Sequence, residues 1–155
     1  MTIVATIRIQ EADFDIAREV SALTAGRTDI GAVVSFSGIC RGTEGNAPIV
    51  ALTLEHYPEM AEAEIKRHAD EAIARWPLQG LTVIHRVGRI MPGENIVLVV
   101  TASQHRQAAF EAAEFLMDYL KTNAPFWKRE EGASGANGAE ARSHDDDAAA
   151  RWTKS

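Results

Sequence analysis

Residues 103–130 contain the strongest structural signal in the sequence, an amphipathic helix that leads directly into a short extended segment. Ser103 is expected to cap this helix. Four apolar residues recur at steps of three and four and should face the core: Phe110, Ala113, Met117 and Leu120. Pro125 cannot continue a helix, because it lacks a backbone N–H. A strand is expected after it, with Phe126, Lys128 and Glu130 on one face.

Cations stand at both ends of this helix, although the chain as a whole has a net charge of −6. At about 100° per residue, Lys121 lies about 20° from the direction of Phe110, so it should sit at the end of the apolar stripe and be partly desolvated. Two interpretations stay open for Lys121. It stabilises the last carbonyls of the helix, or it is an amine that acts as an acid, base or nucleophile.

His105 and Arg106 begin the same helix, and Arg106 lies about 22 Å from Lys121 along the axis at about 1.5 Å per residue. Both ends cannot easily line one small-molecule pocket within one chain. A two-fold dimer would bring the start of one helix close to the end of its neighbour's, and the helix amides with these two side chains would then form an anion site. The alternative is an ordinary solvated helix start.

The rest of the chain alternates strand and helix patterns. Strands are expected at residues 2–10, 31–40, 50–57, 81–87, 96–102 and 140–143, and helices from Asp13 to about Gly26, from 58 to 75, and from 145 onwards. The segment 31–40 is expected to be a central strand, and 81–87 and 96–102 should be interior. Loops are expected at 41–48 and, in a flexible form, at about 131–139.

Composition narrows the possible functions. A chain of 155 residues with 46% hydrophobic content should form one domain, residues 1–155. The acidic balance argues against general nucleic-acid binding. Cys40 is the only cysteine, so no intrachain disulfide can form, and no zinc spacing is present. Cys40 could be a sulfur carrier, but its apolar strand favours a buried, inert thiol. We find no signal peptide or membrane span and expect a cytoplasmic protein without a metal.

Several strings, taken together, resemble one known family. They are GAVVSFSGICRG, LTLEHYPEM, VIHRVGRIMPGE and HRQAAFEAAEFLMDYLKTNAPFWKRE, followed by EAR and a terminal AAARW. In this order they resemble the catalytic (large) subunit of molybdopterin synthase over nearly the whole chain. The resemblance implies an α+β fold of the α/β hammerhead type, with a mixed, mainly antiparallel sheet and packed helices.

The resemblance also implies a reaction in molybdenum cofactor biosynthesis. Cyclic pyranopterin monophosphate (precursor Z) would receive two sulfur atoms and become molybdopterin. The sulfur would come from the C-terminal Gly-Gly thiocarboxylate of a small ubiquitin-like partner subunit. A homodimer of the large subunit would form the core of a heterotetramer, and no cofactor is implied. The alternative is a non-catalytic scaffold that binds a ubiquitin-like partner.

The family's functional residues map onto matching positions of this sequence. Lys121 and Lys128 would be catalytic and would also bind substrate. The other implied substrate-binding residues are Ile39, Cys40, Arg41, His105, Arg106, Arg129, Glu130 and Arg142, and Phe36 and Met117 would flank the partner's tail. His105 and Arg106 would serve the neighbouring subunit. The sequence departs from the family at GASGANGA before EAR and at GTEGNAP after the strand, where Glu44 is the only charge.

Overall fold

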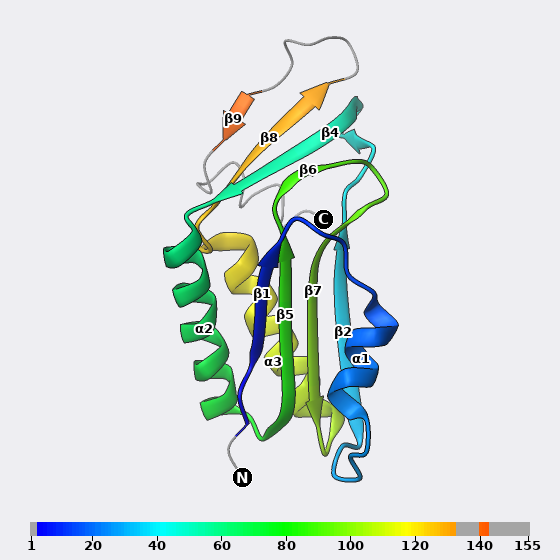
Figure 1. Ribbon diagram of the computed structural model, residues 1–155, viewed down its shortest axis with the longest axis vertical. Coiled ribbons are helices and arrows are strands. Elements are labelled where there is room, and N and C mark those ends of the chain that lie inside the picture. The colour runs from blue at the N-terminus through cyan, green and yellow to red at the C-terminus, as the bar shows by residue number, and fades with distance from the viewer. Residues whose placement is uncertain (1–2, 133–139, 143–155) are drawn as a thin grey trace.

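The computed structural model describes residues 3–132 and 140–142. In these residues, three helices and nine strands follow one another along the chain: β1 (Thr6–Gln10), α1 (Ile16–Thr24), β2 (Ala32–Ile39), β3 (Thr43–Glu44), β4 (Ala47–His56), α2 (Pro58–Arg75), β5 (Leu78–Arg86), β6 (Gly88–Ile90), β7 (Asn95–Ser103), α3 (Arg106–Thr122), β8 (Phe126–Gly132) and β9 (Glu140–Arg142). The strands form two sheets, and the second sheet lies across the end of the first (Figure 1).

The first sheet has the strand order β1-β5-β7-β2. Only the β1–β5 pair is parallel, so the predicted α+β class with a mixed, mainly antiparallel sheet is confirmed. The interior positions predicted for β5 and β7 are also confirmed. The central position expected for residues 31–40 is wrong, because β2 lies at the edge and pairs with β7 alone among the described strands. Its residues alternate between half-buried and exposed, as in a strand with one covered face.

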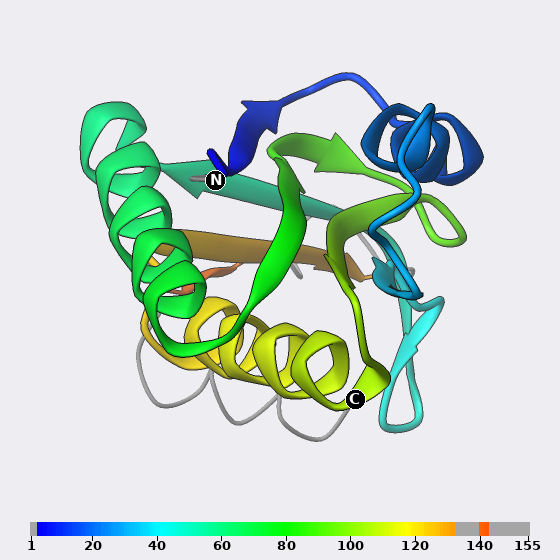
Figure 2. The same cartoon turned by 90° about the horizontal axis from the view of Figure 1, so that it is seen from below.

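Helices cover both faces of this sheet (Figure 2). Helices α2 and α3 lie on one side, where Val83, Val97 and Val99 join the main hydrophobic core. Helix α1 lies on the other side, where Phe14 packs with Ile84, Leu98 and Val100 in a second cluster. Since successive side chains of a strand point to opposite faces, the apolar runs of β5 and β7 supply both cores.

The second sheet contains a hairpin that was expected to be a loop. Strand β3 pairs with the start of β4 through Thr43 with Pro48 and Glu44 with Ala47, so the loop prediction for 41–48 holds only in part. Gly45 has a φ of 60° at the turn, a conformation that glycine adopts without a Cβ penalty. Strand β8 pairs with β4 on one side and with β9 on the other, and β6 also pairs with β4.

Two predicted helix caps are wrong. Asp15, not Asp13, caps α1, and its carboxylate accepts a hydrogen bond from the Arg18 N–H at 3.1 Å. Ser103 is the last residue of β7, and its hydroxyl donates to the carbonyl of His105, which precedes α3. The boundaries predicted for the helix at 58–75 are confirmed, as is the strand near residue 140.

Three of the four core positions predicted for α3 are confirmed, because Ala113, Met117 and Leu120 are buried. Phe110 is 60% exposed, so its assignment to the core is wrong. The buried residues are Ala109, Ala112, Ala113, Leu116, Met117, Tyr119 and Leu120. The three alanines of this set allow α3 to pack closely on its neighbours.

Two sequence predictions fall wholly or mainly outside the described residues. Of the flexible loop expected at 131–139, Glu131 and Gly132 belong to β8, and the other positions lie outside the described residues. The helix expected from residue 145 lies outside them as well. Within the part of the chain that the structure describes, no helix is both long and apolar enough to cross a membrane.

Candidate active site

A cavity of about 260 Å³ lies where the end of β2, the β3–β4 hairpin, the end of α3 and strand β8 meet. We call it the pocket. It is lined by Phe36, Ser37, Gly38, Ile39, Cys40, Arg41, Glu44, Ile49, Leu52, Ile96, Lys121, Lys128 and Glu130. Three cations, Arg41, Lys121 and Lys128, therefore share one cavity with two carboxylates and a set of apolar side chains.

Lys121 enters the pocket from the last turn of α3. Its side chain is half-buried, and its Nζ lies 5.7 Å from the centroid of the Phe36 ring on β2. An ammonium at this distance from an aromatic face is attracted by the ring quadrupole. The aromatic ring thus holds the amine at the pocket wall without neutralising it.

Lys128 is the most deeply buried of the three cations, with 9% of its surface exposed. It lies on β8 opposite Leu54 of β4, whereas Arg129, the next residue, is exposed. Its Nζ is 3.3 Å from Oε1 of Glu130, and the two side chains are 11% and 16% exposed. The predicted inward face shared by Phe126, Lys128 and Glu130 is confirmed, because strand alternation sends Arg129 to the other side.

Arg41 follows the end of β2 and lies at the exposed side of the pocket. Its Nη2 is 3.3 Å from Oε2 of Glu44, with side chains 51% and 28% exposed. This contact places a carboxylate from the β3–β4 hairpin next to a guanidinium that faces the cavity. Glu44 was noted in the sequence only as an isolated charge, and the structure makes it part of the wall.

Cys40 lies next to Arg41 and is 4% exposed, so its predicted burial is confirmed. Its Sγ is 3.6 Å from the Arg41 carbonyl oxygen and 4.0 Å from that of Ile90. Burial raises the pKa of the Cys40 thiol above its usual value, although the positive charge of Lys128 acts in the opposite direction. The neutral thiol is therefore favoured at neutral pH, and the position is suited to lining the pocket rather than to nucleophilic attack.

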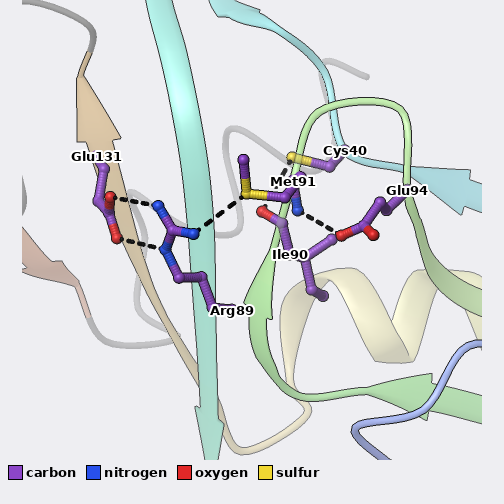
Figure 3. A network of polar contacts seen from close by, with 6 residues as sticks. All are labelled: Cys40, Arg89, Ile90, Met91, Glu94 and Glu131. Carbon is purple, nitrogen blue, oxygen red and sulfur yellow. Dashed lines mark hydrogen bonds and ion pairs between the residues drawn. The ribbon is translucent and has the colours of Figure 1, made fainter.

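The turn between β6 and β7 holds the backbone of Cys40 from both sides. The Cys40 N–H donates to the Glu94 carbonyl at 2.9 Å, and the Gly93 N–H donates to the Cys40 carbonyl at 2.7 Å. The Glu94 carboxylate closes the turn by accepting from the Met91 N–H at 2.7 Å (Figure 3). Gly93 has a φ of 88°, which few other residues tolerate.

Strand β6, which leads into this turn, is tied to β8 by an ion pair between Arg89 and Glu131 (Figure 3). The guanidinium donates two hydrogen bonds, of 3.1 and 3.0 Å, to the two carboxylate oxygens, the paired geometry that gives such contacts their directional strength. The ion pair thereby links β8, which carries Lys128 and Glu130, to the strand before the turn that holds Cys40.

The pocket brings together seven of the residues singled out in the sequence: Phe36, Ile39, Cys40, Arg41, Lys121, Lys128 and Glu130. Four others do not line it. His105 and Arg106 are exposed at the opposite end of α3, Met117 is packed in the main core, and Arg129 is exposed on β8. For Arg142, the structure places its backbone opposite that of Lys128 in the β8–β9 pair.

Comparison with known proteins identifies the family. The family model for the MoaE protein matches residues 9–123. The molybdopterin synthase catalytic subunit of Mesorhizobium japonicum is 66% identical over 152 residues, which cover 97% of this chain and 94% of that protein. The chain belongs to the MoaE family.

Solved MoaE structures share this arrangement of sheets and helices. The MoaE protein from Burkholderia ambifaria is 44% identical and has a TM-score of 0.78, with 97% of this chain and 99% of that one covered. A complex of subunits 1 and 2 of molybdopterin-converting factor from Helicobacter pylori matches at 24% identity and a TM-score of 0.68, covering 86% and 88%. At that identity the second likeness concerns the fold alone.

Several pocket residues of this MoaE chain were missed in the sequence: Ser37, Gly38, Glu44, Ile49, Leu52 and Ile96. Leu52 lies opposite Glu130 in the β4–β8 register, a pairing that no local pattern reveals. A Cβ on Gly38 would come within 2.8 Å of Cγ1 of Val97, so close packing of β2 on β7 requires glycine there. Among the described residues, no group of three or more His, Cys, Asp or Glu side chains could hold a metal ion.

Proposed function

We propose that this chain is the catalytic subunit of a molybdopterin synthase and that its pocket is the site of sulfur transfer. In this reaction precursor Z receives two sulfur atoms from the C-terminal thiocarboxylate of a small ubiquitin-like subunit. The observation that carries the proposal is the presence of Lys121, Lys128 and Arg41 in one cavity, where three cations face two carboxylates. In an acidic protein, such a cluster favours anionic reactants.

The charges of the reactants fit this cluster. A thiocarboxylate and a cyclic phosphate are both anions, and their approach is opposed by mutual repulsion. Fixed cations remove that repulsion and hold the two groups at reacting distance. Because water is largely excluded around Lys128, its charge acts on developing negative charge more strongly than it would in bulk solvent.

The depths of the two lysines support different roles. Lys121 is half-buried and held over Phe36, where it can exchange protons with a reactant or with solvent, so we assign it as the main acid/base or covalent group. Lys128 is deeper and lies beside Glu130, so we assign it as the anchor for the carboxylate or thiocarboxylate of the tail. Ile39, Cys40, Arg41 and Glu130 would contact substrate, and Phe36 would flank the tail.

A second copy of the chain completes the proposal. His105 and Arg106 are exposed about 22 Å from Lys121 along α3, so they cannot reach the pocket of their own chain. We propose that they bind the pterin phosphate in the neighbouring copy, within a homodimer that carries one small subunit at each end. Arg129 and Arg142 belong to the same proposal as substrate contacts, and Met117 as a flank of the tail. Residues 1–155 would act as one domain in the cytoplasm, without a cofactor.

The test is reconstitution of the purified chain with thiocarboxylated small subunit and precursor Z, with molybdopterin measured as product. Lys121→Ala should abolish product formation while binding of the small subunit persists. Lys66→Ala is the matched control, because Lys66 is an exposed lysine of α2 paired with Asp70. Near-normal turnover by Lys121→Ala would refute its assignment. No product with the unaltered chain would favour the non-catalytic scaffold.

A further inference from the structure

Two cations of the pocket lie beside carboxylates of the same chain. Arg41 is 3.3 Å from Glu44, and Lys128 is 3.3 Å from Glu130. In a site for anionic reactants, each carboxylate occupies a position that a reactant's anionic group would also favour. The nitrogen–oxygen distances of the two pairs are equal, but the strands that carry the pairs and their exposure to water differ.

The Lys128–Glu130 pair is fixed by its strand. Both residues lie on the same face of β8, which is hydrogen-bonded to β4 on one side and to β9 on the other. Their side chains are 11% and 16% exposed. Separating them would leave a charge with little access to water, which is costly. Glu130 is therefore a permanent neighbour of Lys128.

The Arg41–Glu44 pair is more accessible to water. Glu44 lies on β3, which pairs with β4 at two positions only and is followed by Gly45 in the turn. The Arg41 side chain is 51% exposed and that of Glu44 is 28% exposed, so water can solvate both charges when they part. Breaking an exposed pair of this kind costs little.

We propose that Glu44 is a displaceable counter-anion for Arg41, which an anionic group of a reactant replaces when it enters the pocket. This rests on the proposed function of the pocket. A phosphate offers the guanidinium two oxygens in the fork geometry that it prefers, so it can replace the Glu44 carboxylate without loss of hydrogen bonds. Binding of any anion to Arg41 then breaks the Arg41–Glu44 contact, and the free energy of that contact is subtracted from the binding free energy of the anion. Glu44 thus lowers the affinity of the pocket for anions and eases product release.

The binding test uses the chain alone, with inorganic phosphate as the probe and the backbone amide signals of the pocket followed by NMR, which every variant retains. Glu44→Gln should tighten phosphate binding about two- to fivefold, the range set by exposed ion pairs. Glu62→Gln, an exposed glutamate of α2, makes the same change in net charge and should leave the affinity unaltered. In an Arg41→Gln background, Glu44→Gln should have no effect, because the competition acts through Arg41.

Unchanged affinity in Glu44→Gln, or an equal gain in the Arg41→Gln background, would overturn the proposal. In the reconstituted enzyme, Glu44→Gln should lower KM for the pterin phosphate by the same factor without a fall in the rate of the chemical step in single turnover. Collapse of that rate would instead make Glu44 a catalytic acid or base. The phosphate titration needs neither partner nor turnover, so its outcome is independent of whether the chain makes molybdopterin.

Discussion

The Lys128–Glu130 ion pair should have a larger coupling free energy than exposed ion pairs with a shorter nitrogen–oxygen distance. At 3.3 Å and an effective dielectric constant of about 20, the Coulomb attraction is about 5 kcal/mol. The side chains are only 11% and 16% exposed, so water screens this attraction little. When one partner is replaced, the remaining charge relaxes toward other polar groups, and this relaxation takes up more than half of the energy. A coupling free energy of about 2 kcal/mol should remain.

A double-mutant cycle with Lys128→Met and Glu130→Gln measures this coupling by urea unfolding at one fixed protein concentration. Lys66 and Asp70 on α2 provide the control cycle. They are closer, at 2.8 Å, but their side chains are 63% and 55% exposed, so their coupling should be about 0.5 kcal/mol or less. We therefore predict that burial, not distance, decides which of the two ion pairs has the larger coupling free energy.

Salt provides a second criterion. At 1 M ionic strength the Debye length is about 3 Å, so the coupling of the exposed pair should nearly vanish, whereas the buried pair should keep most of its coupling. Equal coupling energies for the two pairs, or an equal fractional loss in salt, would refute the view that the pocket is a low-dielectric environment. Lys128 would then act on a bound anion no more strongly than an exposed lysine does.

Three further predictions concern the surroundings of the pocket. Tyr119→Phe should stabilise the protein by about 1 kcal/mol, because the buried hydroxyl has no hydrogen-bond partner among the described residues while the ring stacked on His68 is kept. Burial raises the pKa of Tyr119 to about 12, so the unaltered protein should lose stability in urea unfolding as pH rises above about 10, and the variant should lose less. Alkylation of Cys40, followed by mass spectrometry, should be slow in the native protein at pH 8 and fast in urea, because burial raises the pKa of the thiol. Glu94→Ala should lower protection of the Cys40 and Gly93 amides against hydrogen exchange about fivefold, because the turn loses the hydrogen bond from the Met91 N–H to the Glu94 carboxylate. Unchanged protection would contradict a role of the Glu94 carboxylate in holding this turn against Cys40.

Local patterns predicted most elements of the fold but not their neighbours. The helix at 58–75 could be predicted because Pro58 and Trp76 mark its ends within a single stretch of sequence. The edge position of β2 could not, because pairing depends on residues far away in the chain. Strands β3 and β6 are short and lie beside glycines, which are typical of turns. The sequence pattern therefore predicts a loop and gives no sign that these residues pair with β4.

The orientation of α3 shows a different limit. Phe110 is the largest apolar side chain of the pattern, but three of the seven buried residues are alanines, which differ little in hydrophobicity from polar residues and so blur the position of the buried face. An error in helix phase moved Phe110 inward, yet Lys121 still reached the pocket because it lies at the boundary of the buried face. The strand parity that placed Lys128 is more robust, since each position can face only one of two ways.

The number of residues between α3 and β8 determines which side chains of β8 face the pocket. The N–H of Ala124 bonds to the carbonyl of Tyr119 at 3.2 Å, and that of Phe126 bonds to the carbonyl of Ala124 at 2.8 Å, which leaves little slack in the turn. If an added residue slid β8 by one position along β4, Arg129 would turn inward and Lys128 would face away. A slide of β8 along β4 therefore keeps the Lys128 side chain on the inward face only when it covers an even number of positions.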